Sequence, residues 1–212
     1  MTPATDREQL RRPALVLAPR LLGAIVVSDV GGVEVAVRLT EVEAYSGSGV
    51  DPAAHSHRGP TPRAAIMFGP PGRLYVDFSY GVHWCANVVV GPEGDGEAVL
   101  LRAGEVVLGE ELARSRRPAA RSARDLAGGP ARLTQALGIG RDDLDTDLLD
   151  ASSAVRLHRG PAPAAISAGP RVGISLATDL PWRFWETDAP SVSVFRPGGK
   201  SRRRSAGQDG AP

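Results

Sequence analysis

Polar and apolar residues alternate along several stretches of this chain, at the period-two spacing of half-buried strands. Residues 33–39 show this pattern and continue into the acidic segment 40–45, while residues 23–28 form an apolar run. Gly31 and Gly32 lie between the two segments and favour a turn. We therefore predict two consecutive strands near the start of the chain.

A second set of strands is predicted after a stretch rich in glycine and proline. Three apolar segments separated by short turn signals predict an antiparallel meander over residues 73–79, 82–90 and 97–103. Tyr80 and Gly81 form the turn between the first two of these strands. Two later strands are predicted at residues 171–176 and 191–195.

Helices are predicted apart from these strands. Residues 18–23 resemble a short helix end closed by a glycine, and residues 105–116 have a helical pattern. Pro130 begins a further helix that runs to Leu137, because proline suits the first helical turn. Strands in meanders with helices elsewhere in the chain indicate an α+β fold, an antiparallel curved sheet with helices around it.

The length of 212 residues suits a single domain with one sizeable core. We expect residues 1–12 to be flexible and residues 13–196 to form the domain. Residues 197–212, rich in glycine, arginine and serine, are expected to be a disordered tail. The loop at 46–62 is long for a compact domain, and loops of this kind tend to be functional.

Composition limits the location and the cofactors. No run of about 18 apolar residues exists to span a membrane, and the polar N-terminus lacks the apolar core of a signal peptide. We therefore expect a cytoplasmic protein. The single Cys85 excludes an intrachain disulfide and is predicted to be a buried core thiol. No metal and no cofactor are expected, because the histidines lack zinc-ligand spacing and no phosphate-binding glycine motif occurs.

Arginine supplies almost all of the positive charge. Lys200 is the only lysine and lies in the predicted tail, which disfavours an enzyme that forms an imine with a buried amine. The net charge of +1 says little about nucleic acid. Several arginines cluster between Arg114 and Arg124; a solvated face is the favoured interpretation, and a phosphate-binding patch is the alternative.

Two glutamates are the first candidates for chemistry. Glu41 and Glu43 are two residues apart on a predicted strand, so their side chains point to one face. Next to a loop that carries histidines, this pair suggests the rim of a pocket. Taken alone, the segment equally fits a solvated strand end.

The motifs that follow the glutamates form an ordered series: AAHS at 53–56, GRLYVDFSYG at 72–81, HWCAN at 83–87, VLLRA at 99–103, GPARL at 129–133 and GPRVGI at 169–174. Together with Glu43-Ala44-Tyr45, this series resembles the alkyladenine (3-methyladenine) DNA glycosylase family. The resemblance covers roughly residues 14–195, and several motifs in the right order are more specific than any one of them.

The resemblance implies a monofunctional DNA glycosylase. Such an enzyme flips alkylated or deaminated purines out of duplex DNA, hydrolyses the N-glycosidic bond with an activated water and so initiates base excision repair. It also implies the fold shared with the C-terminal domain of a tRNA formyltransferase. Damaged duplex DNA is the implied partner. We expect a monomer with no obligate protein partner, no membrane association and no cofactor.

By resemblance, Glu43 matches the family's catalytic acid, which takes a proton from water and stabilises the sugar cation. Arg102 matches an arginine that holds the water and the carboxylate, with a structural ion pair as the alternative. An arginine partner would keep Glu43 ionised near neutral pH, and Glu105 is a candidate to brace that arginine.

Further positions match residues that contact the base or the DNA. Tyr45 and His55 match positions that line the base pocket, and Asn87 matches one that crowds the minor-groove edge of normal guanine. Tyr80 matches the hairpin tyrosine that fills the gap left by the flipped nucleotide. The plainer interpretations are a loop histidine at His55 and an exposed turn aromatic at Tyr80.

Asp77 departs from the family, which usually has a second stacking aromatic at this position. Tyr75, Asp77 and Ser79 share one face of a predicted strand, so Asp77 can reach the pocket. An acid there could attract a cationic alkylpurine or weaken stacking, which leaves the substrate range open. Arg63 and Arg171 are candidate phosphate or structural contacts.

Two other functions stay in consideration. A nucleic-acid-binding module without catalysis would not need Glu43, Arg102 and Tyr80 together. A nucleoside hydrolase acting on small substrates would not need an exposed aromatic on a hairpin. Activity on duplex DNA compared with activity on free nucleosides distinguishes the hydrolase from the glycosylase.

Overall fold

A single antiparallel sheet organises the chain. The structure, a computed structural model, describes residues 6–29, 32–79 and 81–198. Six of the eight described strands pair in the order β3-β4-β5-β2-β1-β6, and β8 pairs with both β2 and β7. The strands are β1 (Ile25–Asp29), β2 (Glu34–Tyr45), β3 (Leu74–Ser79), β4 (His83–Val90), β5 (Glu97–Leu108), β6 (Val155–His158), β7 (Ile166–Gly169) and β8 (Arg183–Glu186).

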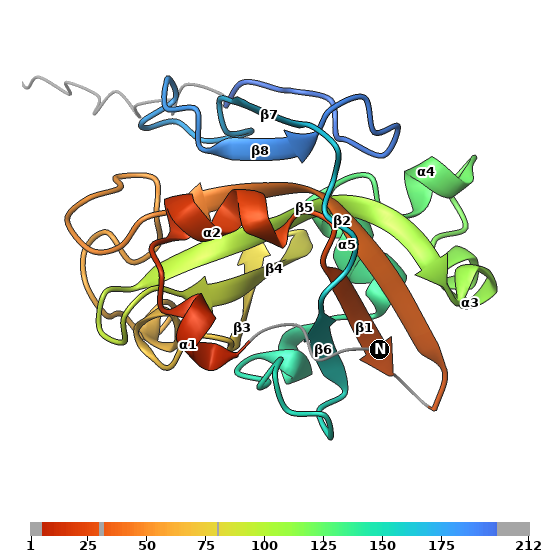
Figure 1. Cartoon of the computed structure of the whole chain (residues 1–212), viewed down its shortest axis with the longest axis horizontal. Helices are drawn as coiled ribbons and strands as arrows, with labels where there is room; N and C mark the ends of the chain where they lie inside the picture. Colours follow the sequence, from red (N-terminus) through yellow and green to blue (C-terminus); the bar gives the residue numbers. More distant parts are fainter. Residues whose placement is uncertain (1–5, 30–31, 80, 199–212) are drawn as a thin grey trace, which may run out of the picture.

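The two longest strands, β2 and β5, form the curved centre of the sheet (Figure 1). Every strand pair is antiparallel, so the predicted curved sheet and the predicted β3-β4-β5 meander are confirmed. Strand β2 has strands on both sides, because it pairs with β1, β5 and β8. The residues near its C-terminal end are therefore held firmly in place.

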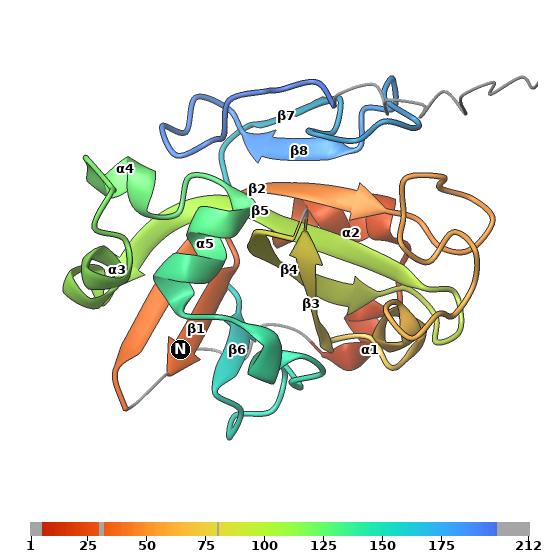
Figure 2. The ribbon, with the colours of Figure 1, turned by 180° about the vertical axis from the view of Figure 1, so that it is seen from behind.

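Helices lie on both faces of the sheet. The helices are α1 (Arg7–Leu10), α2 (Ala14–Leu21), α3 (Glu110–Arg116), α4 (Ala123–Leu126) and α5 (Pro130–Leu137), with 3-10 turns η1 (Ala65–Phe68) and η2 (Arg141–Asp143). Helix α2 is in front of the sheet in Figure 1, and α5 is in front of it in Figure 2. Strands in one sheet with separate helices confirm the α+β class, whereas the formyltransferase-like resemblance stays a prediction.

Helix α5 has the limits that its sequence predicts. Pro130 is its first residue, and Leu133, Ala136 and Leu137 are fully buried on one face. Gly138 ends the helix in the left-handed region at φ 74°, where a glycine avoids the strain of a Cβ atom. The apolar face of α5 packs in the main core cluster with residues of β2, β4 and β5.

The predicted helix at 105–116 is wrong in its first part. Strand β5 continues to Leu108 because its residues 105–108 pair with residues 36–38 of β2. Gly109, at φ 73°, then turns the chain into α3, which begins at Glu110. Pairing with β2 therefore determines the conformation of residues 105–108, and the local sequence pattern does not reveal a partner strand so far away in the chain.

The predicted strands at 171–176 and 191–195 are also wrong, and β6, β7 and β8 were not predicted. Residues 171–176 and 191–195 are irregular. The backbone N–H groups of Val172 and Ser193 donate to the buried carboxylates of Glu43 and Glu41 rather than to a neighbouring strand. An alternating sequence pattern does not distinguish a backbone that pairs with a strand from one that donates to a buried carboxylate.

The N-terminal stretch 1–12, expected to be flexible, includes helix α1, whose Leu10 is fully buried. Residues 199–212, most of the predicted tail, lie outside the described residues. The domain limits 13–196 therefore stay a prediction. Within the described ranges, no helix combines the length and the apolar character needed to cross a membrane.

Candidate active site

A cavity of about 560 Å³ opens at the C-terminal end of β2. Its volume lies in the range of roughly 300–1,000 Å³ that is usual for small-molecule pockets. The predicted site residues Tyr45, His55, Asp77, Asn87 and Arg102 all line it. The structure thus brings together residues from β2, β3, β4, β5 and the loop 46–62.

Two buried acids lie beside the cavity on β2. The side chains of Glu41 and Glu43 are fully buried and reach the same arginine, as expected for residues two apart on a strand. That arginine is Arg102 on β5. The pairing register shifts between Glu41 and Val42, where β5 advances from Ala103 to Leu101 and leaves Arg102 without a partner in the ladder. A shift of this kind re-aims a side chain, here toward both carboxylates.

Glu43 has three polar partners. The Tyr45 hydroxyl donates to one carboxylate oxygen at 2.9 Å, and the Val172 N–H donates to the other at 2.7 Å. A guanidinium nitrogen of Arg102 lies 3.4 Å away. Burial raises the pKa of Glu43, and this effect outweighs the opposing effects of Arg102, Val172 and Tyr45. Arg102 lowers this pKa, as expected, but burial has the larger effect, and the ionisation of Glu43 near neutral pH stays a prediction.

The Glu43 carboxylate lies one side-chain layer behind the cavity. Its partners Tyr45, Arg102 and Val172 line the cavity, whereas Glu43 is not among the lining residues. A water molecule or sugar that reaches Glu43 must therefore pass between these partners. Tyr45 and Arg102 belong to strands, so Val172, in an irregular segment, has the least constrained backbone of the three.

Glu41 organises the other side of Arg102. Its carboxylate accepts from the Arg102 Nε at 2.9 Å, the Arg183 Nε at 2.7 Å and the Ser193 N–H at 2.7 Å. The sequence predicts Glu41 beside Glu43 at the rim of a pocket, but it does not predict the contact of Glu41 with Arg102. Arg183 was missed, because it is brought to the site by the unpredicted pairing of β8 with β2.

The expected brace from Glu105 to Arg102 is wrong. Glu105 instead lies 3.6 Å from Arg38, a residue that also pairs with Glu186. Strand residues three apart point to opposite faces, so Glu105 and Arg102 diverge. Glu41, rather than Glu105, accepts the hydrogen bond from Arg102.

Tyr45 is held from behind by a buried arginine. The Arg171 guanidinium lies 4.6 Å from the centre of the Tyr45 ring and 5.0 Å from that of Trp182. It also binds Asp51 through two nitrogens, and both side chains are fully buried. Of the two interpretations left open for Arg171, the buried position supports the structural one.

Four further polar residues of the cavity lining contact one another: His55, Tyr75, Asp77 and Arg63. Arg63 binds the Asp77 carboxylate through two nitrogens at 2.7 and 2.8 Å, and a nitrogen of Arg63 lies 3.3 Å from His55 Nε2. The His55 Nδ1 lies 3.0 Å from the Tyr75 hydroxyl. Burial lowers the pKa of His55, and Arg63 lowers it further while Asp77 opposes both effects. Tyr75 and Arg63 therefore join the pocket residues predicted from sequence.

Asn87 and Cys85 lie on β4 and also line the cavity. Asn87 pairs with Tyr75 in the sheet, and its side-chain nitrogen donates to the Tyr75 carbonyl at 3.1 Å. Cys85 is only partly buried and lines the cavity, so the prediction of a core thiol is wrong in its position. Burial raises the pKa of Cys85 to about 11, which keeps the thiol protonated and weakly nucleophilic.

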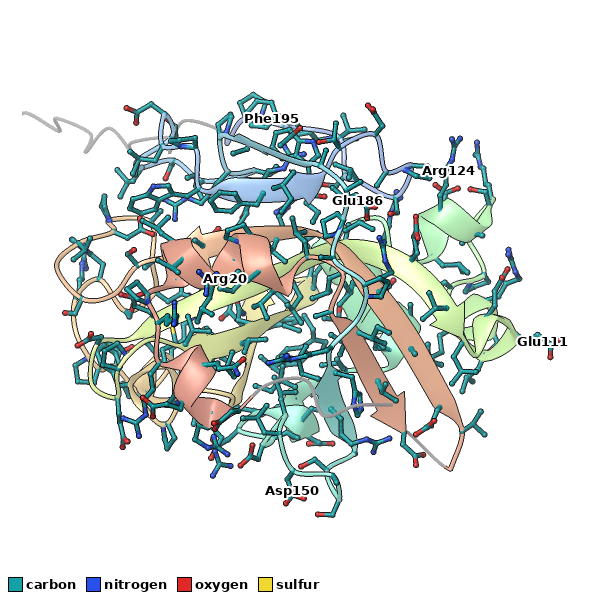
Figure 3. All side chains as sticks on the ribbon, viewed as in Figure 1. Arg20, Glu111, Arg124, Asp150, Glu186 and Phe195 are labelled. Carbon is teal, nitrogen blue, oxygen red and sulfur yellow. The ribbon has the colours of Figure 1, made fainter. Side chains whose placement is uncertain are left out.

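Two further expectations concern contacts with DNA. Tyr80 lies outside the described residues. In the arginine cluster, Arg116 and Arg117 donate to backbone carbonyls of Ala136 and Leu126 and so tie α3 to its neighbours. Arg124, a residue of α4, lies at the outer edge of the molecule (Figure 3). Among the residues of described position, no three His, Cys, Asp or Glu side chains form a group suited to a metal ion.

The chain was compared with known proteins. The family profile described as "Methylpurine-DNA glycosylase (MPG)" matches residues 8–190. A protein of Nocardia farcinica is 54% identical over 185 residues, 84% of this chain and 85% of that protein. One of Streptomyces avermitilis is 46% identical over 208 residues, 96% of this chain and 97% of that protein. Both bear the name "Putative 3-methyladenine DNA glycosylase". The chain belongs to the methylpurine-DNA glycosylase family.

Proposed function

We propose that this protein is a monofunctional DNA glycosylase that removes alkylated or deaminated purines from duplex DNA and so starts base excision repair. The observation that carries the proposal is the buried Glu43 carboxylate, which is paired with Arg102 of the cavity lining and lies directly behind a cavity of about 560 Å³. Family membership supports the same reaction class. The named relatives point to 3-methyladenine as one substrate.

In this proposal Glu43 is the general base. The glycosidic C–N bond breaks with a sugar that carries positive charge in the transition state, and an ionised carboxylate stabilises that charge and accepts a proton from the attacking water. Arg102 is shared by Glu43 and Glu41, so it orients the Glu43 carboxylate within a fixed network. The products are a free base and an abasic site.

Tyr45 and His55 hold the flipped base, and Asn87 limits entry of normal guanine. Tyr45 has Arg171 behind its ring, which fixes the orientation of the stacking surface. Stacking of an aromatic side chain on a base contributes roughly 1–3 kcal/mol. Tyr80, between β3 and β4 in the sequence, is proposed to fill the gap in the duplex.

The test compares the wild type with Glu43→Gln in single-turnover reactions on duplexes that carry one 3-methyladenine, 7-methylguanine or hypoxanthine, with abasic sites cleaved by alkali. We expect Glu43→Gln to slow base release by roughly 10²–10⁴-fold, because the amide cannot accept the proton. Binding to an abasic duplex should be retained.

Glu105→Gln is the matched control, since Glu105 lies on the neighbouring strand and contacts Arg38 rather than Arg102. This variant should keep the wild-type rate. Undiminished turnover by Glu43→Gln would refute the role of Glu43. Equal rates on free nucleosides and on duplex DNA would indicate a nucleoside hydrolase, and binding without release by the wild type would indicate a binding module.

A further inference from the structure

Four side chains form a closed ring of polar contacts on one wall of the cavity. Arg63 binds Asp77 through two nitrogens at 2.7 and 2.8 Å, and it contacts His55 Nε2 at 3.3 Å. The His55 Nδ1 lies 3.0 Å from the Tyr75 hydroxyl, which in turn donates to Asp77 at 3.4 Å. The contacts are mutually consistent when His55 is neutral, accepts from Arg63 at Nε2 and donates at Nδ1.

The two charged members of this ring differ in mobility. The Asp77 side chain is only 5% exposed and sits on β3, where its backbone pairs with Cys85. The Arg63 side chain is 56% exposed and belongs to the loop before η1. The Arg63 guanidinium can therefore be solvated by water when it leaves Asp77, whereas Asp77 stays in place.

The buried carboxylate requires a cation nearby. Removing one partner of a buried ion pair leaves an uncompensated charge, which is strongly unfavourable. Within the described part of the chain, Arg63 is the only arginine or lysine paired with Asp77. A molecule that displaces Arg63 from Asp77 must therefore bring a positive charge of its own.

A purine that enters the cavity meets this pair. Both Arg63 and Asp77 line the cavity, as Tyr45 does. A purine alkylated at N3 or N7 carries a formal positive charge while it is still attached to deoxyribose. Hypoxanthine in DNA is neutral. The first kind of base can exchange with the guanidinium at Asp77, and the second kind cannot.

We propose that Arg63 is an exchangeable counter-ion of Asp77, and that this exchange makes the enzyme select cationic alkylpurines over neutral lesions. The inference rests on the proposed glycosylase function and specifies its substrate class. Asp77 then acts as a specificity-determining residue rather than as a catalytic one. Arg63 pairs with Asp77 until a positively charged base enters the cavity and replaces it.

The test measures the ratio of single-turnover base release from 7-methylguanine and hypoxanthine duplexes at subsaturating enzyme. We expect Asp77→Asn to lower this ratio by roughly 10- to 100-fold, since one charge contact at a buried carboxylate shifts an equilibrium by one or two powers of ten. Arg63→Gln removes the competing cation, so it should keep or raise the ratio. Asp77→Asn combined with Arg63→Gln should give the low ratio of Asp77→Asn.

Two results would overturn the inference: a ratio for Asp77→Asn within twofold of the wild type, or a loss of 7-methylguanine release in Arg63→Gln as large as that in Asp77→Asn. The second result would make Arg63 a fixed wall of the pocket. Binding of both duplexes to Glu43→Gln, with and without Asp77→Asn, gives the same comparison without turnover. If the wild type releases neither base, the proposed function itself fails, whereas release with an unchanged ratio removes only the selection by Asp77.

Discussion

The carboxyl group of Glu43 links the protonation of one residue to the stability of the whole fold. It is fully buried, and burial raises its pKa above the ordinary value of 4.5. Below that pH both the folded and the unfolded chain carry the proton. As the pH rises, the unfolded chain loses its proton first, so the free energy of unfolding falls until the folded carboxyl also ionises.

We therefore predict that Glu43→Gln gains stability relative to the wild type as the pH rises above 4.5. The gain is about 1.4 kcal/mol for each unit by which the pKa is raised. Urea unfolding at a series of pH values measures it. Glu111→Gln, at an exposed carboxyl on α3 (Figure 3), is the control and should follow the wild type. A stability difference between Glu43→Gln and the wild type that shrinks as the pH rises would contradict the prediction.

Among structural elements, the loop 46–62 depends on one buried ion pair. Arg171 binds Asp51 through two nitrogens, donates to the Ala44 carbonyl and contacts the Tyr45 ring. These contacts join the loop, β2 and the segment after β7. The position of His55 in this loop therefore depends on a side chain far away in the sequence.

Replacing Arg171 by methionine should lower the free energy of unfolding by roughly 3–5 kcal/mol, because Asp51 is left as an unpaired buried charge. Arg114→Met is the matched control, since its pair with Glu110 is exposed and such pairs contribute about 0–1 kcal/mol. Chemical denaturation measures both. If the two variants lose equal stability, Arg171 does not hold the loop in the manner described.

At the same scale, the sequence predicts elements whose pattern is local. Strands β3, β4 and β5 are apolar segments that clear turn signals separate. Helix α5 has a proline at its start and a glycine directly after its end. The four-residue strands β6, β7 and β8 were missed because their pairing partners, rather than their own patterns, decide their conformation. Residues 171–176 have the sequence pattern of a strand, but the backbone N–H of Val172 donates to the Glu43 carboxylate instead of to a neighbouring strand.

The site was predictable where it lies on regular strands. Glu43, Tyr45 and Asp77 follow from alternation and from the motif series, and all lie at the cavity or directly behind it. The role of Glu41 as the partner of Arg102 and Arg183 was not predictable, because β8 comes from 140 residues further along the chain. The pairing of Arg63 with Asp77 was also not predictable, because Arg63 lies in a loop, where sequence periodicity does not indicate the direction of a side chain.

For the molecule as a whole, the scarcity of lysine restricts the reactions that the protein can perform on DNA. Lys200 is the only lysine of the chain. An enzyme that cuts the DNA strand after base removal commonly forms an imine between an amine and the sugar. The proposed reaction uses water in place of an amine and leaves the strand intact.

We predict that Lys200→Arg keeps the wild-type rate of base release, and that borohydride traps no covalent complex with a damaged duplex. The product strand should stay uncut until alkali is added. Denaturing gel electrophoresis measures both the trapped complex and the uncut strand. A borohydride-trapped complex that disappears in Lys200→Arg would show that the enzyme uses an amine after all.

Strand β2 has hydrogen-bonded neighbours on each of its edges, and Glu43 stands on it. The backbone of Glu43, the proposed general base, is therefore fixed, because it cannot move toward a nucleotide without breaking hydrogen bonds of the sheet. Access must come from the irregular segments that carry Val172 and Arg63, which form the cavity wall without belonging to the ladder. Under the proposed function, substitutions in these segments can change the lesion preference while β2, which carries the proposed general base, stays unchanged.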